Sequence, residues 1–416
     1  MEWFENAKLG IFIHWGIYAV KGVAESWEFY SGRMEYDDYM EQLDGFTAKN
    51  YNPEKCAELF KKIGVKYVVL TSKHHDGVAL WDTKANDLSV VQKTPAKRDL
   101  IAPYCEAMRK NGLKVGLYYS HLDWSHPDYP SIHAPWPSNR FTDPPEGVPD
   151  DFARWESFLK FHRTQLHELL TGYGTLDLLW FDGTWERTAE QWKFKEMRDF
   201  IRKTSPNTLV NARIGEYGDY ECPENSLPTV QPEGRWELCQ TLTDSWGYRA
   251  CDTNYKSVRE IVRIFTECIG MGGNLLLGIG PKEDGTLDEK VESTLTELGE
   301  WVNTHGEAIY GTERGLPAGL FHGNSTLSKD KKTLYLFYHD IPVDQICIKG
   351  ICSEAKRVTV LDSGASLPFR VNGGLNEKPG LLWINFTKEH VNKVCTVLKV
   401  EFDEPIRLYL GKSGGI

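Results

Sequence analysis

The chain has 416 residues, of which 41% are hydrophobic and 26% charged, and its formal net charge is -11. Because one hydrophobic core usually stops growing near about 250–300 residues, this length predicts a large domain and a smaller one. The mean hydropathy of -0.44 excludes a chain dominated by membrane-spanning segments, and the acidic balance argues against a nucleic-acid partner, because such proteins concentrate positive charge on one face.

The first residues, MEWFENAKLGIFIHWG, run directly into a strand-like segment without the hydrophobic stretch of a secretion signal. We therefore expect a cytoplasmic location, with secretion or periplasmic export left open if a leader has been removed. None of the nine cysteines forms a closely spaced zinc or redox pair. Cys56, Cys105 and Cys268 fall on apolar faces of predicted helices, which is typical of reduced thiols in a reducing compartment.

From about residue 9 to 310, short apolar runs alternate with helical periods, which is typical of parallel strands covered by helices. The predicted strands are 9–16, 66–75, 114–120, 176–183, 208–213 and 273–280. Apolar stripes with helical spacing lie at 56–63, 101–108 and 258–265. No glycine-rich phosphate loop follows the first strand, so we predict a (β/α)8-like (TIM) barrel over residues 1–312, with one or two irregular units.

After about residue 312 the pattern changes to short strands separated by turn signals. These strands are predicted at 333–339, 345–350, 356–362, 381–386, 396–402 and 406–411. The pattern predicts a C-terminal antiparallel β-sandwich domain over residues 313–416.

Within the barrel, the stretch 123–150 is too long and too rich in Pro, Ser, His and Asp for a simple connection, and we expect a functional loop there.

Polar residues end the predicted barrel strands, and the active site of a (β/α)8 barrel lies at this end. They are His14 and Trp15, His74 and His75, the run from Tyr118 to His121, Asp182, and Arg213, on five successive strands. Any one of them has an ordinary explanation, such as a core histidine or a helix-capping aspartate. Five strands that end in this way on one rim favour a functional site.

Asp182 is the sharpest single candidate, because LDLLWFDG places a carboxylate between a long apolar strand and a glycine turn. Its position suits a nucleophile, with Trp180 lining a sugar subsite. Glycoside hydrolysis needs a second carboxyl group to assist the leaving oxygen. The Pro/Gly-rich segment after Arg213 offers five, and spacing does not choose among them: Glu216, Glu221, Glu224, Glu233 and Glu237. We expect at least three of the five to be merely solvated.

Two other classes of protein fit the same residues. His14, His74, His75 and Asp182 are suitable ligands for a metal-dependent barrel hydrolase, because imidazole and carboxylate suit zinc. Such enzymes usually carry a His-x-His on the first strand, whereas Trp15 follows His14 here. A sugar-binding protein without turnover is the second alternative.

The run GGNLLLGIGPKEDG lacks the spacing of either nucleotide-binding glycine motif, so it does not predict a nucleotide site.

The motifs resemble glycoside hydrolase family 29, the α-L-fucosidases, over essentially the whole chain. They are GIFIHWGIYAV, VVLTSKHHDGVALWDT, GLYYSHLDWSHPDYP, LLWFDG, NLLLGIGPKEDGTL and EAIYGT. The resemblance implies a retaining exo-α-L-fucosidase that acts through a covalent fucosyl-enzyme, with no metal and no organic cofactor. The implied substrate is a fucosylated glycan or small fucoside, without nucleic-acid or membrane partners. Members commonly self-associate, so a homo-oligomer is expected.

The resemblance also implies roles for single residues. Asp182 would be the nucleophile, and Glu224 the acid/base, because GDYECPEN is similar to the family's DY-x-x-P-E-like segment. The implied sugar-binding residues are His14, Trp27, His74, His75, Tyr119, Trp180 and Arg213, with Trp27 as an aromatic wall. One departure is the loop after the first strand, where members carry His-Glu-Trp or Ser-Glu-Trp and this chain reads Glu25-Ser26-Trp27-Glu28. The pocket carboxylate would come from Glu25 or Glu28, or be absent.

Overall fold

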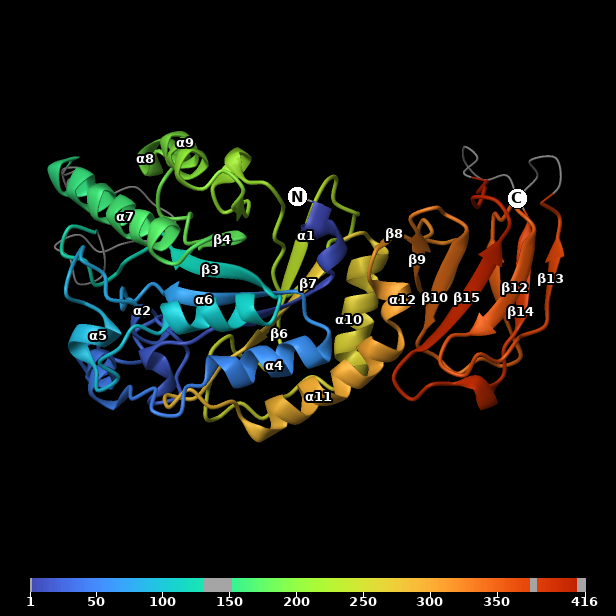
Figure 1. Ribbon diagram of the computed structural model, residues 1–416, viewed down its shortest axis with the longest axis horizontal. Coiled ribbons are helices and arrows are strands. Elements are labelled where there is room, and N and C mark those ends of the chain that lie inside the picture. The colour runs from blue at the N-terminus through green and yellow to red at the C-terminus, as the bar shows by residue number, and fades with distance from the viewer. Residues whose placement is uncertain (1, 130–151, 375–379, 410–416) are drawn as a thin grey trace.

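The computed structural model describes residues 2–129, 152–374 and 380–409. A parallel sheet with its helices forms one part of the molecule, and two antiparallel sheets lie beside it (Figure 1). This arrangement confirms the predicted barrel and β-sandwich. The predicted division at residue 312 stays a prediction, although the first antiparallel strand, β8, begins at Thr312. Most of the functional loop predicted at 123–150 lies outside the described residues.

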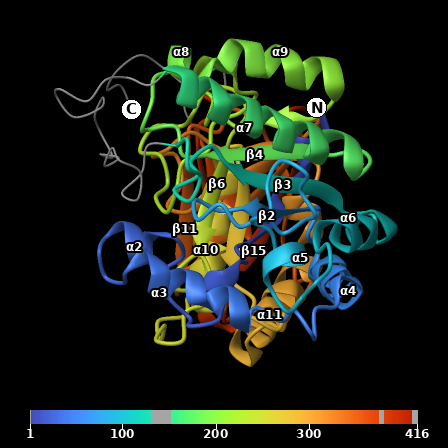
Figure 2. The ribbon, with the colours of Figure 1, turned by 90° about the vertical axis from the view of Figure 1, so that its left-hand side faces the viewer.

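The parallel sheet has seven strands in the order β5-β4-β3-β2-β1-β7-β6. They are β1 (Leu9–Ile13), β2 (Tyr67–Lys73), β3 (Lys114–Ser120), β4 (Leu178–Asp182), β5 (Leu209–Val210), β6 (Glu237–Thr241) and β7 (Asn274–Ile279). All six predicted strands are therefore present, and β6 is a strand that the sequence did not reveal. The sheet curls, and the carboxyl ends of its strands lie at the end of the barrel remote from the antiparallel sheets (Figures 1 and 2).

A short extended segment, residues 219–225, closes the gap between the edge strands β5 and β6. Its parallel bridges join Asn211 to Tyr220, Glu221 to Trp236, and Glu224 to Cys239. Backbone hydrogen bonds support each bridge, among them those from Ala212 N to Tyr220 O (2.9 Å) and from Cys239 N to Pro223 O (3.1 Å). The segment takes the place of one barrel strand, so the wall has eight positions and one of them is irregular.

Helices cover the outside of the barrel (Figure 2). The longer ones are α4 (Pro53–Ile63), α6 (Ile101–Lys110), α7 (Phe152–Gly172), α9 (Phe194–Thr204), α10 (Val258–Gly270) and α11 (Glu289–Thr304). The shorter ones are α1 (Glu2–Ala7), α2 (Trp27–Tyr30), α3 (Tyr36–Met40), α5 (Val90–Lys93), α8 (Ala189–Trp192) and α12 (Gly306–Ile309), with 3-10 turns η1 (Ile17–Ala19), η2 (Glu41–Gly45) and η3 (Gly215–Tyr217). The three predicted apolar stripes correspond to α4, α6 and α10, which places their apolar faces against the sheet.

Local sequence signals fix the ends of these helices. Asn52 caps α4 by accepting a hydrogen bond from Lys55 N, and Gly64 ends the helix at a φ of 99°, where a side chain would be strained. Ser257 and Glu260 form a capping box at the start of α10.

Side chains of the barrel strands alternate between two apolar layers, because successive residues of a strand point to opposite faces. The inner layer includes Phe12, Val69, Tyr118, Trp180 and Leu276. The outer layer, between strands and helices, includes the residues that alternate with them, such as Ile11, Leu117, Tyr119, Leu179 and Leu277. This alternation decides which strand residues can reach the barrel mouth.

The antiparallel part contains a five-stranded sheet of order β12-β15-β10-β9-β8 and a three-stranded sheet of order β11-β14-β13. Its strands are β8 (Thr312–Arg314), β9 (Asn324–Ser328), β10 (Thr333–Tyr338), β11 (Gln345–Lys349), β12 (Ala355–Val360), β13 (Phe369–Asn372), β14 (Leu381–Asn385) and β15 (Thr396–Phe402), with the turn η4 (Lys388–His390). Five predicted strands are present. Of the sixth, at 406–411, the described part has only a bridge between Leu408 and Ile351.

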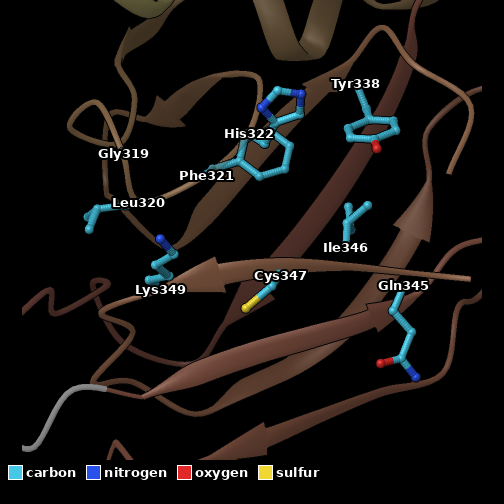
Figure 3. Close-up of a pocket in the computed structure, with 9 residues that line it drawn as sticks. All are labelled: Gly319, Leu320, Phe321, His322, Tyr338, Gln345, Ile346, Cys347 and Lys349. Carbon is cyan, nitrogen blue, oxygen red and sulfur yellow. The ribbon is translucent and has the colours of Figure 1, made fainter. Parts of the chain in front are cut away.

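A hollow of about 430 Å³ opens in the antiparallel part, beside strand β11 (Figure 3). The ring of Tyr338 and the imidazole of His322 lie at its upper rim, and Cys347 and Lys349 lie below them. His322 is 88% exposed, so much of this rim is open to solvent. All nine cysteines are free, including Cys56, Cys105 and Cys268, for which reduced thiols were predicted. Within the described residues, no helix is both long and apolar enough to cross a membrane.

Candidate active site

Asp182, the last residue of β4, is the centre of a polar cluster at the barrel mouth. Its Oδ2 atom accepts a hydrogen bond from the Tyr118 hydroxyl at 3.1 Å, and its Oδ1 atom lies 3.5 Å from Arg213 Nη1. Burial raises the pKa of the Asp182 carboxyl, while Arg213, the Gly183 N–H and the Tyr118 hydroxyl oppose this shift. The side chain is 18% exposed, so it still faces the pocket.

His14, His74 and His75 surround Asp182 at the ends of β1 and β2. Each is at most 6% exposed, and burial lowers the pKa of each imidazole well below its usual value. The three rings are therefore neutral at neutral pH, and each offers one hydrogen-bond donor and one acceptor. His75 Nε2 lies 3.8 Å from Asp182 Oδ2. Within the described residues, both His75 Nε2 and His14 Nδ1 are buried without a hydrogen-bond partner.

Two serines set the tautomers of His74 and His75. Ser120 Oγ donates to the Leu122 carbonyl, so its contact with His75 Nδ1 at 2.5 Å uses the Nδ1 proton, and Nε2 is left as an acceptor. Ser26 Oγ accepts from Asp76 N, and its own proton is free to go to His74 Nδ1 at 2.5 Å. His74 then carries its proton on Nε2. The pair presents one donor and one acceptor, which suits a substrate with several hydroxyl groups.

Arg213 joins two carboxylates at the end of β5. Its Nη2 atom donates to Glu224 Oε2 at 2.9 Å, while Nη1 faces Asp182. The Glu224 side chain is 41% exposed, compared with 18% for Asp182. The cluster therefore contains one enclosed carboxylate and one at the opening, fixed in relation to each other by the same guanidinium group.

Aromatic rings form one wall of the site. Trp27, on α2, stacks on Trp185 with ring centroids 5.9 Å apart and contacts His75 edge-on at 5.5 Å. On another side, Trp246 stacks on His14 at 4.9 Å. Rings and imidazoles that alternate in this way suit a ligand with both apolar and hydroxylated faces.

Comparison with known proteins agrees with this geometry. The sequence profile described as alpha-L-fucosidase matches residues 1–307. The chain belongs to the α-L-fucosidase family. These proteins are glycoside hydrolases, and the predicted family and enzyme class are thereby confirmed.

Individual relatives show how far the similarity extends. The tissue α-L-fucosidase of Macaca fascicularis is 31% identical over 339 residues, which covers 75% of this chain and 69% of the relative. The structure of α-L-fucosidase isoenzyme 1 from Paenibacillus thiaminolyticus has a TM-score of 0.86 and 33% identity, covering 97% of this chain and 98% of that one. A fucosidase from Bacteroides thetaiotaomicron, trapped as a covalent intermediate, has a TM-score of 0.83 and 26% identity, covering 98% and 95%.

Most of the sugar-binding residues predicted from the fucosidase resemblance lie together. His14, His74, His75, Arg213 and Trp27 surround Asp182, as described above. Trp180 lies one layer deeper, where it is 2% exposed and stacks beneath Tyr118 with centroids 5.7 Å apart. The Arg213 guanidinium lies 5.7 Å from the Trp180 ring, so Trp180 supports the polar cluster around Asp182 from below.

Tyr119 is the exception, and its placement corrects the prediction. It belongs to the outer layer of the barrel, and its hydroxyl donates to Gln165 of α7 at 2.9 Å. Since neighbouring strand residues face opposite sides, Tyr118 is the tyrosine that reaches Asp182. Trp185 and Trp246 were missed altogether, because both lie in connections where periodicity carries no signal.

Among the five candidate glutamates, and within the described residues, only Glu224 contacts the Asp182–Arg213 cluster. Glu216, Glu221 and Glu233 are exposed. The sequence analysis placed Glu237 in a loop, but Glu237 begins β6 and is fully buried. Its carboxylate accepts from the Tyr67 hydroxyl at 2.6 Å and from Trp180 Nε1 at 2.9 Å, and burial raises its pKa to about 7.

The structure also separates Glu25 from Glu28. Glu25 is buried, burial raises its pKa to about 7, and its Oε1 atom accepts from the Gly247 N–H at 2.6 Å. It thereby holds the loop that carries Trp246. Glu28 turns away and forms an ion pair with Arg33 at 3.2 Å. Of the two, Glu25 is the carboxylate connected to the walls of the site.

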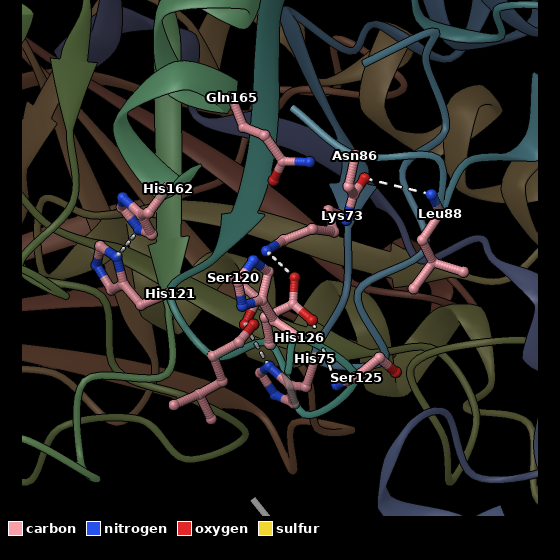
Figure 4. Close-up of polar contacts among 12 residues, drawn as sticks. Lys73, His75, Asn86, Leu88, Ser120, His121, Ser125, His126, His162 and Gln165 are labelled. Carbon is pink, nitrogen blue, oxygen red and sulfur yellow. Dashed lines mark hydrogen bonds and ion pairs between the residues drawn. The ribbon is translucent and has the colours of Figure 1, made fainter. Parts of the chain in front are cut away.

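A buried polar network supports the histidine turn from outside the barrel (Figure 4). Lys73 Nζ forms an ion pair with Asp123 at 2.9 Å, and both side chains are at most 1% exposed. Further along the same rim, His121 Nδ1 contacts His162 at 3.1 Å, and His121 Nε2 donates to the Arg213 carbonyl at 3.2 Å. His121 therefore fixes the position of the Arg213 backbone.

No three His, Cys, Asp or Glu side chains in the described parts of the chain are placed to share a metal ion.

Proposed function

We propose that this chain is a retaining exo-α-L-fucosidase in which Asp182 is the nucleophile and Glu224 the acid/base. The observation that carries the proposal is the Arg213 guanidinium, which contacts Asp182 at 3.5 Å and Glu224 at 2.9 Å at the mouth of the barrel. A retaining glycosidase needs two carboxyl groups on either side of the scissile bond, one enclosed and ionised, one able to exchange protons.

In the first step, an Asp182 carboxylate oxygen attacks the anomeric carbon and forms an ester bond. The bond from that carbon to the leaving oxygen breaks, and the Glu224 carboxyl transfers its proton to this oxygen. In the second step, Glu224 takes a proton from water, whose oxygen attacks the same carbon and displaces Asp182. Two displacements restore the original anomeric configuration, and the sugar is released with retention.

The surroundings of Asp182 suit this role. A nucleophile must be ionised, and the Arg213 guanidinium, the Tyr118 hydroxyl and the Gly183 N–H all stabilise the anion against the effect of burial. The donor on His74 and the acceptor on His75 would bind neighbouring hydroxyl groups of fucose. Trp27 and Trp246 would pack against the less polar edge of this deoxy sugar.

Two similar structures support the mechanism. The Bacteroides thetaiotaomicron protein was trapped as a covalent intermediate with 2-fluoro-fucosyl fluoride. The Thermotoga maritima α-fucosidase, with a TM-score of 0.76 and 30% identity, was solved with a mechanism-based inhibitor. We infer that the same kind of intermediate forms on Asp182.

The proposal is tested with 4-nitrophenyl α-L-fucoside in the presence of EDTA. The wild-type chain should release 4-nitrophenol, and proton NMR should show the α anomer of fucose first. Asp182→Asn should lower kcat by at least about 10³-fold, since the nucleophile is lost. Inversion of the first product, or attachment of a 2-fluoro-fucosyl group to another residue, would reject Asp182 as the nucleophile. Activity lost in EDTA and restored by metal would favour the metal-dependent alternative.

Glu224 is tested separately by chemical rescue. Glu224→Ala should be slow, and added azide should restore turnover, because azide attacks the fucosyl-enzyme without needing a general base. Glu216→Ala and Glu233→Ala serve as matched controls from the same loop and should keep nearly full activity. Azide rescue of one of these variants instead of Glu224→Ala would transfer the acid/base role.

A further inference from the structure

A groove of about 360 Å³ adjoins the catalytic cluster on the side of Glu224. It is lined by Ala212, Arg213, Glu221, Cys222, Pro223, Pro228 and Pro232. Arg213 belongs both to this groove and to the Asp182–Glu224 pair. Arg213 therefore borders both the groove and the site in which the proposed reaction takes place.

Apart from the Arg213 guanidinium, the walls of this groove are poor in hydrogen-bond donors. Three of its seven residues are prolines, which have no backbone N–H. The backbone of the remaining wall is engaged in closing the barrel, since Ala212 N donates to Tyr220 O and Pro223 O accepts from Cys239 N. The apolar character continues outside the groove, because Val230, between two of the prolines in sequence, is 79% exposed. A surface of this kind favours a flat apolar ligand over a strongly hydrated one.

The direction of the chemistry determines what reaches this groove. Asp182 attacks the anomeric carbon from one face, and the leaving oxygen departs on the other, where the proton donor stands. Glu224 follows directly after Glu221–Pro223, which form one wall of the groove. Any group attached beyond the scissile oxygen must therefore extend along this wall.

We propose that the groove of Pro223, Pro228 and Pro232 is the leaving-group subsite and that it selects fucosides whose leaving group presents a flat apolar ring. This inference rests on the proposed function. The proline rings pack against the face of the leaving group, while Arg213 keeps the glycosidic oxygen beside Glu224. Fucose binding itself depends on the histidines and tryptophans described above, on the opposite side of Arg213.

The test compares two substrates that share fucose and differ in the leaving group. 4-Nitrophenyl α-L-fucoside places an aromatic ring in the groove, whereas α-L-fucosyl fluoride places a single atom there. The double variant Pro228→Ala/Pro232→Ala removes two ring faces. We expect the ratio of kcat/KM for the aryl fucoside to kcat/KM for the fluoride to fall about 10-fold, a loss typical of a few missing apolar contacts.

Pro206→Ala is the matched control, because Pro206 is exposed in the turn after α9 and lies outside the groove. It should leave the ratio unchanged. Turnover of the fluoride by the double variant shows that it is folded. An unchanged ratio, or an equal fall for both substrates, would overturn the leaving-group subsite. If the wild-type chain hydrolysed neither substrate, the fucosidase proposal itself would fail, which is a different result from either.

Discussion

At the scale of single residues, burial and hydrogen bonding act on Asp182 in opposite directions. The Tyr118 hydroxyl is one of the groups that keep this carboxylate ionised. Tyr118→Phe removes that donor, so the pKa of Asp182 rises and less of the enzyme carries the anion at a given pH. The acidic limb of the kcat/KM profile should move to higher pH, and kcat/KM at pH 7 should fall about 10-fold, as expected for a hydrogen bond to a charged group.

Tyr119→Phe provides the control for this prediction, because the two tyrosines are adjacent in sequence and face opposite layers. It removes a hydrogen bond to Gln165 and should cost about 1 kcal/mol of stability. The pH profile should not move. If Tyr119→Phe shifted the acidic limb and Tyr118→Phe did not, the assignment of inner and outer faces on β3 would be wrong.

Glu237 makes stability depend on pH without taking part in the reaction. Burial raises its pKa from 4.5 to about 7, so between these values the folded chain keeps a proton that the unfolded chain releases. The associated stability is complete below about pH 4.5 and is lost as the pH rises through 7, by an amount on the order of 3 kcal/mol. Glu237→Gln should remove this component. The check is urea unfolding of both proteins from pH 5 to 8, in which parallel curves would contradict it.

At the scale of elements, the buried Lys73–Asp123 pair ties the end of β2 to the turn after β3. Lys73→Met leaves Asp123 buried without its cation and should destabilise the fold by about 3–5 kcal/mol. Lys73→Met/Asp123→Leu should recover much of this loss, because no unpaired charge remains. Denaturant unfolding of both single variants and the double variant measures the coupling. Additive losses would show that the two groups do not depend on each other.

The segment that closes the barrel should open more easily than the regular strands. It is held by three isolated bridges, whereas β2 and β3 pair along a continuous ladder. Backbone amides of Glu221 and Asn225 should therefore exchange with deuterium at least about 10-fold faster than those of Val69 and Gly116. Hydrogen exchange followed by mass spectrometry or NMR measures this difference directly. Equal protection would mean that the segment behaves as an eighth regular strand.

The contrast between β4 and β6 shows what the sequence could and could not predict. In LDLLWFDG the four residues 178–181 are all apolar, as is typical of a buried parallel strand, and the carboxylate that follows them marked the candidate active site. ELCQT, in β6, carries a glutamate that is satisfied by Tyr67 and Trp180, partners more than fifty residues away. Such a residue looks like a loop carboxylate until the barrel is formed. The error at Tyr119 was different, because strand alternation would have selected Tyr118.

At the scale of the whole molecule, the barrel and the antiparallel sheets share one apolar cluster. Trp301 of α11 donates to the Cys395 carbonyl at 3.0 Å, and Phe337 and Val397 belong to the same cluster as the helices. His305 Nε2 lies 2.6 Å from Asp362 across this contact. Because the shared cluster couples the two parts, we expect a single calorimetric unfolding transition. Two well-separated transitions would show that they unfold independently.

Self-association and a cytoplasmic location stay predictions from the sequence. Light scattering of the purified chain would test the first. The concentration should be varied, because assembly of identical subunits depends on it.

The division of the barrel rim has a consequence for engineering. The prolines assigned to the departing group come from a single stretch between β5 and β6, which also carries Arg213 and Glu224. That stretch has no long helix to anchor it, only the short turn η3. Replacing residues 226–234 with the corresponding residues of a relative, while Arg213 and Glu224 are kept, should therefore alter acceptor preference while the sugar itself stays the same.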